Sequence, residues 1–163
     1  MEFDMKIINV GVGELVVSSE PAVLKTILGS CVGVALYSSQ ERIGGLIHIF
    51  LPRMNSPDSN KAKYADTGIP LLITTIEHRY GVAKNKLVAK IAGGANMFPF
   101  KKITSPLLDI GSNNITIVKE TLDRLRIPII EEDVGATYGR RIEFHLDTGK
   151  FIIFSANMQG VLK

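Results

Sequence analysis

Two apolar segments separated by a short polar stretch constrain the fold of this chain most. Residues 31–37 (CVGVALY) and 43–51 (IGGLIHIFL) are rich in β-branched and apolar side chains. The polar stretch between them, residues 38–42 (SSQER), has the length of a hairpin loop. The pattern therefore predicts two adjacent antiparallel strands, with the chain folding back between Ser39 and Gln40.

This register brings the only cysteine of the chain together with a histidine. Cys31 is expected directly opposite His48, with Cβ atoms about 4.5–5.5 Å apart, within reach of a hydrogen bond between sulfur and imidazole. Both side chains would share a face with the small residues Gly33 and Ala35, which leave room for a ligand to approach the thiol. A register slip of one residue would put Cys31 and His48 on opposite faces.

A cysteine beside a histidine is the pair that a cysteine hydrolase needs. The thiolate is the nucleophilic form, and we expect the imidazole of His48 to lower the pKa of the Cys31 thiol. The competing interpretation is that both residues only pack, because free cysteine is among the most buried residue types. Cys31 and His48 are thus the candidate nucleophile and base.

Length and composition predict a single domain over residues 1–163 without a metal or another cofactor. The chain has 163 residues, of which 45% are apolar, enough for a substantial core. One cysteine excludes an intramolecular disulfide, and the three histidines are too scattered for a zinc site.

Charge and hydropathy bound the partners. A formal net charge of +3 is only mildly basic, so we expect no nucleic-acid site. The first residues lack a basic segment followed by a long apolar one, and no apolar run approaches the ~20 residues of a membrane span. We therefore expect a cytoplasmic protein without membrane insertion.

Periodicity and turn residues predict an α+β fold: a layered sandwich whose mixed, largely antiparallel sheet core is flanked by two main helices. The expected helices cover residues 66–80 and 112–125, and the first should begin near Thr67 so that Pro70 falls in its first turn. The expected strands are residues 6–10, 15–17, 23–28, 31–37, 43–51, 87–92, 127–133, 141–146 and 151–155.

Several ordered motifs carry a family resemblance. They are residues 28–34 (LGSCVGV), 44–52 (GGLIHIFLP), 63–67 (KYADT), 90–98 (KIAGGANMF), 109–111 (DIG) with Asn114, 132–135 (EDVG) and 139–140 (GR). Together they resemble the chemoreceptor glutamine deamidases of bacterial chemotaxis, the CheD family, over most of the chain.

The resemblance implies a cysteine amidohydrolase that converts glutamine side chains of chemoreceptor cytoplasmic domains to glutamate and releases ammonia. Cys31 falls on the family's nucleophile and His48 on its base. The reaction would pass through a thioester, with backbone N–H groups of Gly29 and Ser30, in the turn before the thiol, as candidate oxyanion donors. A chemotaxis phosphatase of the CheC type is a further expected partner.

The third catalytic residue of the family is a threonine six positions before the cysteine, which here would be Lys25. Thr26 lies one place nearer, and along a single strand that shift reverses the face. Either a local bulge brings Thr26 to His48, or another group orients the imidazole.

Two alternatives stay open. The protein could be a non-catalytic module that docks to chemoreceptors or to the phosphatase, with the thiol kept only for packing. It could also hydrolyse receptor glutamate methyl esters, because an ester can form the same thioester.

Overall fold

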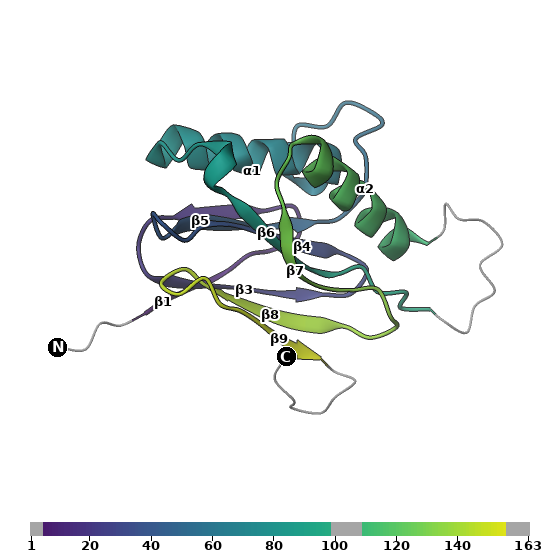
Figure 1. Cartoon of the computed structure of the whole chain (residues 1–163). Helices are drawn as coiled ribbons and strands as arrows, with labels where there is room; N and C mark the ends of the chain where they lie inside the picture. The colour runs from purple at the N-terminus through teal and green to yellow at the C-terminus, as the bar shows by residue number, and fades with distance from the viewer. Residues whose placement is uncertain (1–4, 99–108, 156–163) are drawn as a thin grey trace.

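The structure is a computed structural model that describes residues 5–98 and 109–155. It consists of three layers (Figure 1): the two main helices, a five-stranded sheet beneath them, and a four-stranded sheet beneath that. The helices are α1 (Ala65–Tyr80) and α2 (Ile110–Arg124), and two short 3-10 helices, η1 (Lys61–Lys63) and η2 (Lys84–Lys86), precede α1 and β6. The predicted α+β layered architecture is confirmed.

Both sheets are mixed and mostly antiparallel. The five-stranded sheet has the order β2 (Leu15–Ser18), β5 (Ile43–Ile49), β4 (Val32–Ser38), β6 (Val88–Gly93) and β7 (Ile129–Val134). The four-stranded sheet has the order β1 (Lys6–Asn9), β3 (Ala22–Leu28), β8 (Arg140–His145) and β9 (Phe151–Ser155). Among the strands that the structure describes, only the β1–β3 and β6–β7 pairs are parallel. Each strand predicted from the sequence is present, with small shifts at its ends.

The predicted hairpin forms as β4 and β5, but its register differs by two residues. Gly33, not Cys31, is paired with His48, because Ser38 pairs with Ile43 and leaves a four-residue loop between them. Arg42 closes this loop with a φ of 56°. A shift of two residues keeps every side chain on its predicted face, so the prediction of direct opposition is wrong while the prediction of a shared face is right.

The small residues on the His48 face serve a purpose other than the predicted one. A Cβ atom at Gly33 would lie 3.0 Å from the Ile142 side chain, which belongs to β8 of the other sheet. Ala35 and Leu46 are buried in the same cluster as Ile142 and Phe144. The small side chains therefore let the two sheets pack closely, and they do not leave space for a substrate above the hairpin.

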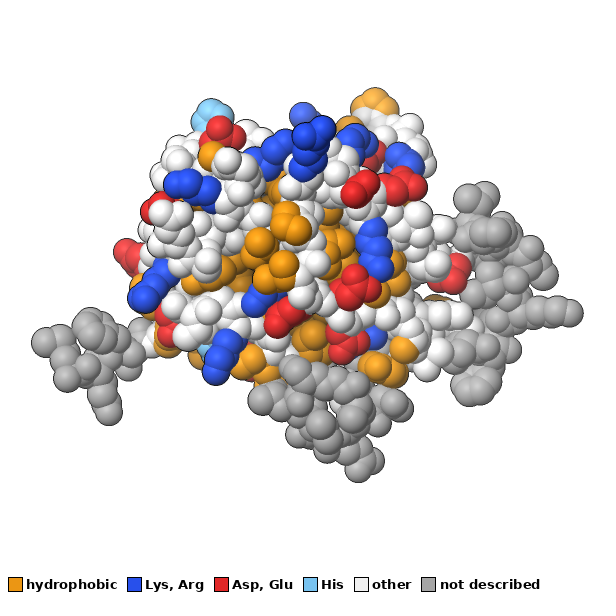
Figure 2. All heavy atoms as spheres, viewed as in Figure 1, with side chains coloured by type: hydrophobic (Ala, Val, Ile, Leu, Met, Phe, Trp, Pro, Cys, Tyr) orange, Lys and Arg blue, Asp and Glu red, His pale blue; other side chains and the backbone are white. Residues whose placement is uncertain are grey.

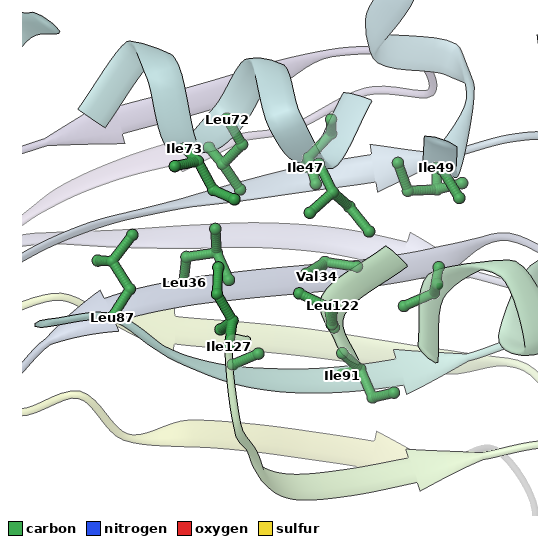
Figure 3. Packing of buried hydrophobic residues seen from close by; sticks show 14 of the residues in the cluster. Val34, Leu36, Ile47, Ile49, Leu72, Ile73, Leu87, Ile91, Leu122 and Ile127 are labelled. Carbon is green, nitrogen blue, oxygen red and sulfur yellow. The ribbon is translucent and has the colours of Figure 1, made fainter. Parts of the chain in front are cut away.

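The opposite face of the five-stranded sheet packs against the helices (Figure 3). Val34, Leu36 and Ile47 from the hairpin meet Leu72 of α1 and Leu122 of α2 in one aliphatic cluster. These aliphatic side chains alternate along the hairpin with those of the His48 face, so they lie on the opposite side of the sheet. It anchors both helices on the sheet that carries His48.

The helix starts differ from those expected. α1 begins at Ala65, so Pro70 lies in its second turn and the expected start near Thr67 is wrong. The earlier start is possible because the N–H groups of Ala65 and Asp66 bond to the carbonyl groups of Leu51 and Pro52. α1 ends at Tyr80, and Gly81, which follows it, has the left-handed conformation typical of a residue that caps the end of a helix. The Asp109 side chain caps α2 by accepting from the N–H of Ser112.

Charged side chains of both signs are interspersed on the face seen in Figure 2, and hydrophobic side chains gather near its middle, where Figure 1 labels β6 and β7. The basic side chains on this face thus do not form a single positively charged patch. Within the described ranges, no helix is both long and apolar enough to cross a membrane.

Gly93, the last residue of β6, provides a test of how tightly the turn before β4 is held. Its φ is +107°, and an added Cβ would collide with the carbonyl oxygen of Cys31. Gly81 has a φ of +68° with nothing within 4 Å of an added Cβ. In urea unfolding, we expect Gly81→Ala to cost about 1–2 kcal/mol from backbone strain alone. Gly93→Ala should cost roughly 3 kcal/mol or more, because the clash adds to the strain. Equal losses in the two variants would contradict this account of the turn.

Candidate active site

A threonine and a histidine from different sheets meet in the interior. Thr26 lies on β3 and His48 on β5, and the Thr26 Oγ1 is 2.7 Å from the Nδ1 of His48. Both residues are buried, with exposed fractions of 6% and 3%. The contact therefore crosses the layer between the sheets and fixes the orientation of the imidazole.

The hydrogen-bond chain around Thr26 also determines which imidazole nitrogen is protonated. The Thr26 hydroxyl donates to the carbonyl oxygen of Val10 at 2.6 Å. A hydroxyl has a single proton, so its contact with His48 requires the N–H of Nδ1 to be the donor. The Val10 carbonyl, 3.4 Å from Nδ1, can also accept from it. Nε2 is then left with its lone pair, as a base requires.

Thr26 reaches His48 without the bulge that the sequence seemed to require. The β3–β8 ladder has no register break, and Thr26 points into the layer between the sheets. Lys25 points the other way and pairs with Glu143 at 3.8 Å. The face argument fails because β3 and β4 belong to different sheets, and the turn between them resets the alternation. Neither alternative is correct as stated: Thr26 itself contacts His48, but no bulge is needed to bring it there.

Cys31 lies in that turn, at the edge of a cavity of about 490 Å³ that His48 also lines. The thiol is partly exposed. In the described part of the chain, the hydrogen bonds of the His48 ring go to Thr26 and Val10, and none goes to the sulfur. The structure therefore places nucleophile and base candidates on one cavity without a bond between them.

Burial opposes charge on both groups. It raises the pKa of the Cys31 thiol above its usual value. It also lowers the pKa of His48, while the Val10 carbonyl and the charge of Glu14 act in the opposite direction. The direction for the thiol is opposite to the one expected from the sequence. Both directions favour an uncharged thiol beside an uncharged imidazole, so a nucleophile at Cys31 would have to be generated by proton transfer.

Gly29 and Ser30 line the same cavity as Cys31. The carbonyl oxygen of Gly29 accepts from the N–H of Ala95 at 3.0 Å, and that of Cys31 from the N–H of Gly94 at 2.8 Å. Outside the helices and strand ladders, the described backbone hydrogen bonds include none donated by Gly29, Ser30 or Cys31. The turn thus has its carbonyl groups anchored in the loop after β6, with N–H groups available as donors.

The mouth of the cavity is apolar. Val12, Ile27, Met97 and Phe98 line it and are exposed by 55%, 75%, 43% and 66%. Such a rim fits a protein segment better than a small charged molecule. Over the described residues, no cluster of three or more His, Cys, Asp or Glu side chains could hold a metal ion.

Sequence reasoning missed the contributions of Val10 and Glu14. Val10 acts through its carbonyl oxygen and Glu14 through its charge near His48. Every residue has a backbone carbonyl oxygen, so the identity of Val10 as a valine does not reveal that its carbonyl accepts a hydrogen bond in the site. Glu14 is an ordinary surface residue until β2 is paired with β5, where its carbonyl accepts from the N–H of His48.

Comparisons with known proteins give a consistent answer. The family described as CheD chemotactic sensory transduction matches residues 50–155. The probable chemoreceptor glutamine deamidase CheD of Caldanaerobacter subterraneus is 44% identical over 153 residues, which cover 92% of this chain and 93% of that protein. The corresponding protein of Haloarcula marismortui is 42% identical over 156 residues, covering 94% and 88%. That of Clostridium botulinum is 45% identical over 153 residues, covering 92% and 93%.

A solved structure, that of the hypothetical protein YfiH of Bacillus licheniformis, aligns with 14% identity and a TM-score of 0.45 over 82% of this chain and 61% of that one. This similarity is too distant to inform function. The family match and the relatives together cover nearly the whole sequence, and the chain belongs to the CheD family of chemotactic sensory transduction proteins.

Proposed function

We propose that this protein is a chemoreceptor glutamine deamidase in which Cys31 is the nucleophile, His48 the general base and Thr26 the residue that orients the imidazole. The observation that carries the proposal is the chain from Val10 through Thr26 to the Nδ1 of His48. This chain leaves Nε2 as a base on the cavity that Cys31 also lines. The names of the CheD relatives support the substrate, a glutamine side chain of a chemoreceptor.

The chemistry follows from these groups. The Cys31 thiol passes its proton to Nε2 of His48 as the sulfur adds to the carboxamide carbon of the substrate. The tetrahedral oxyanion collapses, the C–N bond breaks, and the imidazolium gives its proton to the leaving nitrogen, which departs as ammonia. A water molecule, deprotonated by the same imidazole, then adds to the thioester and releases glutamate and the free thiol. No outside oxidant or cofactor is needed for this balance.

The oxyanion requires preorganised donors in both steps. Gly29 and Ser30 are assigned this role together with the N–H of Cys31, since their peptide groups border the cavity at the nucleophile. In each step, the carbonyl oxygen of the substrate is negative only in the tetrahedral intermediate, which would form next to this turn. Backbone donors that are held in place stabilise such a charge without having to reorient during the reaction.

The proposal extends to location and partners. The substrate would be the cytoplasmic domain of a chemoreceptor, so the protein would work in the cytoplasm as a single domain spanning residues 1–163. A chemotaxis phosphatase of the CheC type would be a second protein partner. The apolar rim formed by Val12, Ile27, Met97 and Phe98 supports a protein substrate.

Removal of the nucleophile is the first test. Cys31→Ala should abolish deamidation of a receptor cytoplasmic fragment while the fold persists, because only a small, partly exposed side chain is lost. Mass spectrometry of the fragment follows the conversion of carboxamide to carboxylate, and methyl esters on the same fragment show whether esterase activity accompanies it. Activity retained by Cys31→Ala would contradict the cysteine mechanism. Inactivity of the unmodified protein on several receptors, with binding preserved, would instead favour a docking module.

The pH dependence of the reaction should report on His48. Since burial lowers the pKa of His48, kcat/KM should stay level as pH falls toward about 6.5 and decrease only below it, when the imidazole becomes protonated. Glu14→Gln removes a charge that raises the pKa of His48, so the acidic limb of kcat/KM should move to lower pH. In the Glu14→Gln variant, a shift of the acidic limb of kcat/KM to higher pH would exclude His48 as the titrating base.

Thr26→Val keeps the shape of the side chain but loses the bond to Nδ1 of His48, so it should reduce kcat about tenfold.

Alkylation distinguishes a neutral pair from a preformed ion pair. Because burial raises the pKa of Cys31, iodoacetamide should react slowly at pH 7 and faster as pH rises past the usual thiol pKa of about 8.5. His48→Ala should show nearly the same profile, since the imidazole does not form a bond with the resting sulfur. Rapid labelling at pH 6–7 that is lost in His48→Ala would mean that a thiolate–imidazolium pair exists before substrate binds.

A further inference from the structure

Asn114 connects the two halves of the site from behind. It lies on α2 and its side chain is fully buried, with an exposed fraction of 0%. Its Nδ2 donates to the carbonyl oxygen of Ser30 and to that of Phe50, each at 3.1 Å. Ser30 precedes Cys31, and Phe50 follows the end of the strand that carries His48. One amide therefore joins the nucleophile turn to the strand of the base.

The orientation of this amide is determined by its partners. Both partners are carbonyl oxygens, which only accept, so the NH₂ group must face them. The Oδ1 of Asn114 is buried and has no hydrogen-bond partner among the described residues. Leaving a buried acceptor unpaired costs about 1–3 kcal/mol. The NH₂ group of Asn114 thus makes the bonds, while its buried oxygen lowers stability. The contribution of the residue to overall stability alone does not explain why an asparagine occupies this position.

Peptide geometry turns this bond into a constraint on the proposed oxyanion site. The carbonyl of Ser30 and the N–H of Cys31 belong to one peptide group, and the described chain has no cis peptide bond. In a trans peptide the C=O and the N–H point in opposite directions. By holding the Ser30 carbonyl toward α2, Asn114 directs the N–H of Cys31 away from α2. The peptide groups on either side are held by backbone donors, the N–H groups of Ala95 and Gly94.

We propose that Asn114 is a positioning residue that holds the peptide between Ser30 and Cys31 so that the Cys31 N–H serves as an oxyanion donor. This inference rests on the proposed acyl-transfer function of Cys31. Asn114 does not touch the substrate, because its side chain is buried and its two partners are carbonyl groups of the protein. Its effect is confined to steps in which a carbonyl oxygen becomes negative.

Two reactions of the same thiol separate this role from a merely structural one. Acylation of Cys31 by p-nitrophenyl acetate passes through a tetrahedral oxyanion: the sulfur adds to the ester carbon, p-nitrophenolate leaves, and the thiol proton goes to His48. Alkylation by iodoacetamide displaces iodide at a saturated carbon and forms no oxyanion. In Asn114→Leu, which removes both donors at similar size, acylation should slow by roughly 10- to 100-fold. Alkylation should change by less than about twofold, and the acidic limb of acylation should not move.

Val118→Ala is the matched control. Val118 is buried on α2, one turn beyond Asn114, and packs in the aliphatic cluster rather than against the nucleophile turn. It weakens the packing of α2 and should leave the ratio of acylation to alkylation unchanged. If Asn114→Leu does not fold, Asn114→Ala gives the same comparison with a smaller side chain.

The outcomes are distinct. Equal losses in acylation and alkylation, or no loss in either, would overturn the role of Asn114. A wild-type protein that is alkylated but never acylated would overturn it as well, since the turn would then hold no oxyanion. Asn114-dependent acylation without deamidation of any receptor would support the role of Asn114 while refuting the proposed receptor substrate.

Discussion

The close packing of the two sheets is the constraint on which the site depends. Thr26 and His48 belong to different sheets, and their 2.7 Å contact crosses the layer in which the sheets pack closely at Gly33, the residue paired with His48. A Cβ at that position would press against Ile142. The orientation of the His48 imidazole therefore depends on how the core packs. A substitution in the layer between the sheets would change this orientation even if the substituted residue lies away from Cys31 and His48.

Burial gives this site its chemical character. The same environment that locks His48 in one tautomer also disfavours charge on the imidazole and on the thiol. A resting ion pair would need to be solvated or compensated, and the acidic group that acts on His48 among the described residues is Glu14. A neutral pair avoids this cost, and in the proposed mechanism the thiol loses its proton only as it adds to the carboxamide.

Much of the fold followed from the sequence because the apolar pattern alternates clearly. The hairpin of β4 and β5 and the division of its two faces were predictable from the residues alone. The register of the hairpin was not predictable. Its loop contains four residues and ends with Arg42 at a positive φ, and an arginine in the sequence does not indicate such a conformation. The small residues beside His48 were misread as space for a ligand, since a sequence shows that a face is small but not what covers it.

The remaining parts of the site act through the backbone, and that is why sequence patterns do not reveal them. Val10 contributes a carbonyl oxygen, and the turn before β4 contributes N–H groups whose direction depends on where its carbonyl groups are tied. Asn114 could be recognised as polar, but its partners, Ser30 and Phe50, are far from it in the sequence and meet it only when α2 lies on the five-stranded sheet. The side chains proposed to carry the chemistry, Cys31 and His48, can thus be recognised in the sequence, whereas the groups that orient them depend on the tertiary structure.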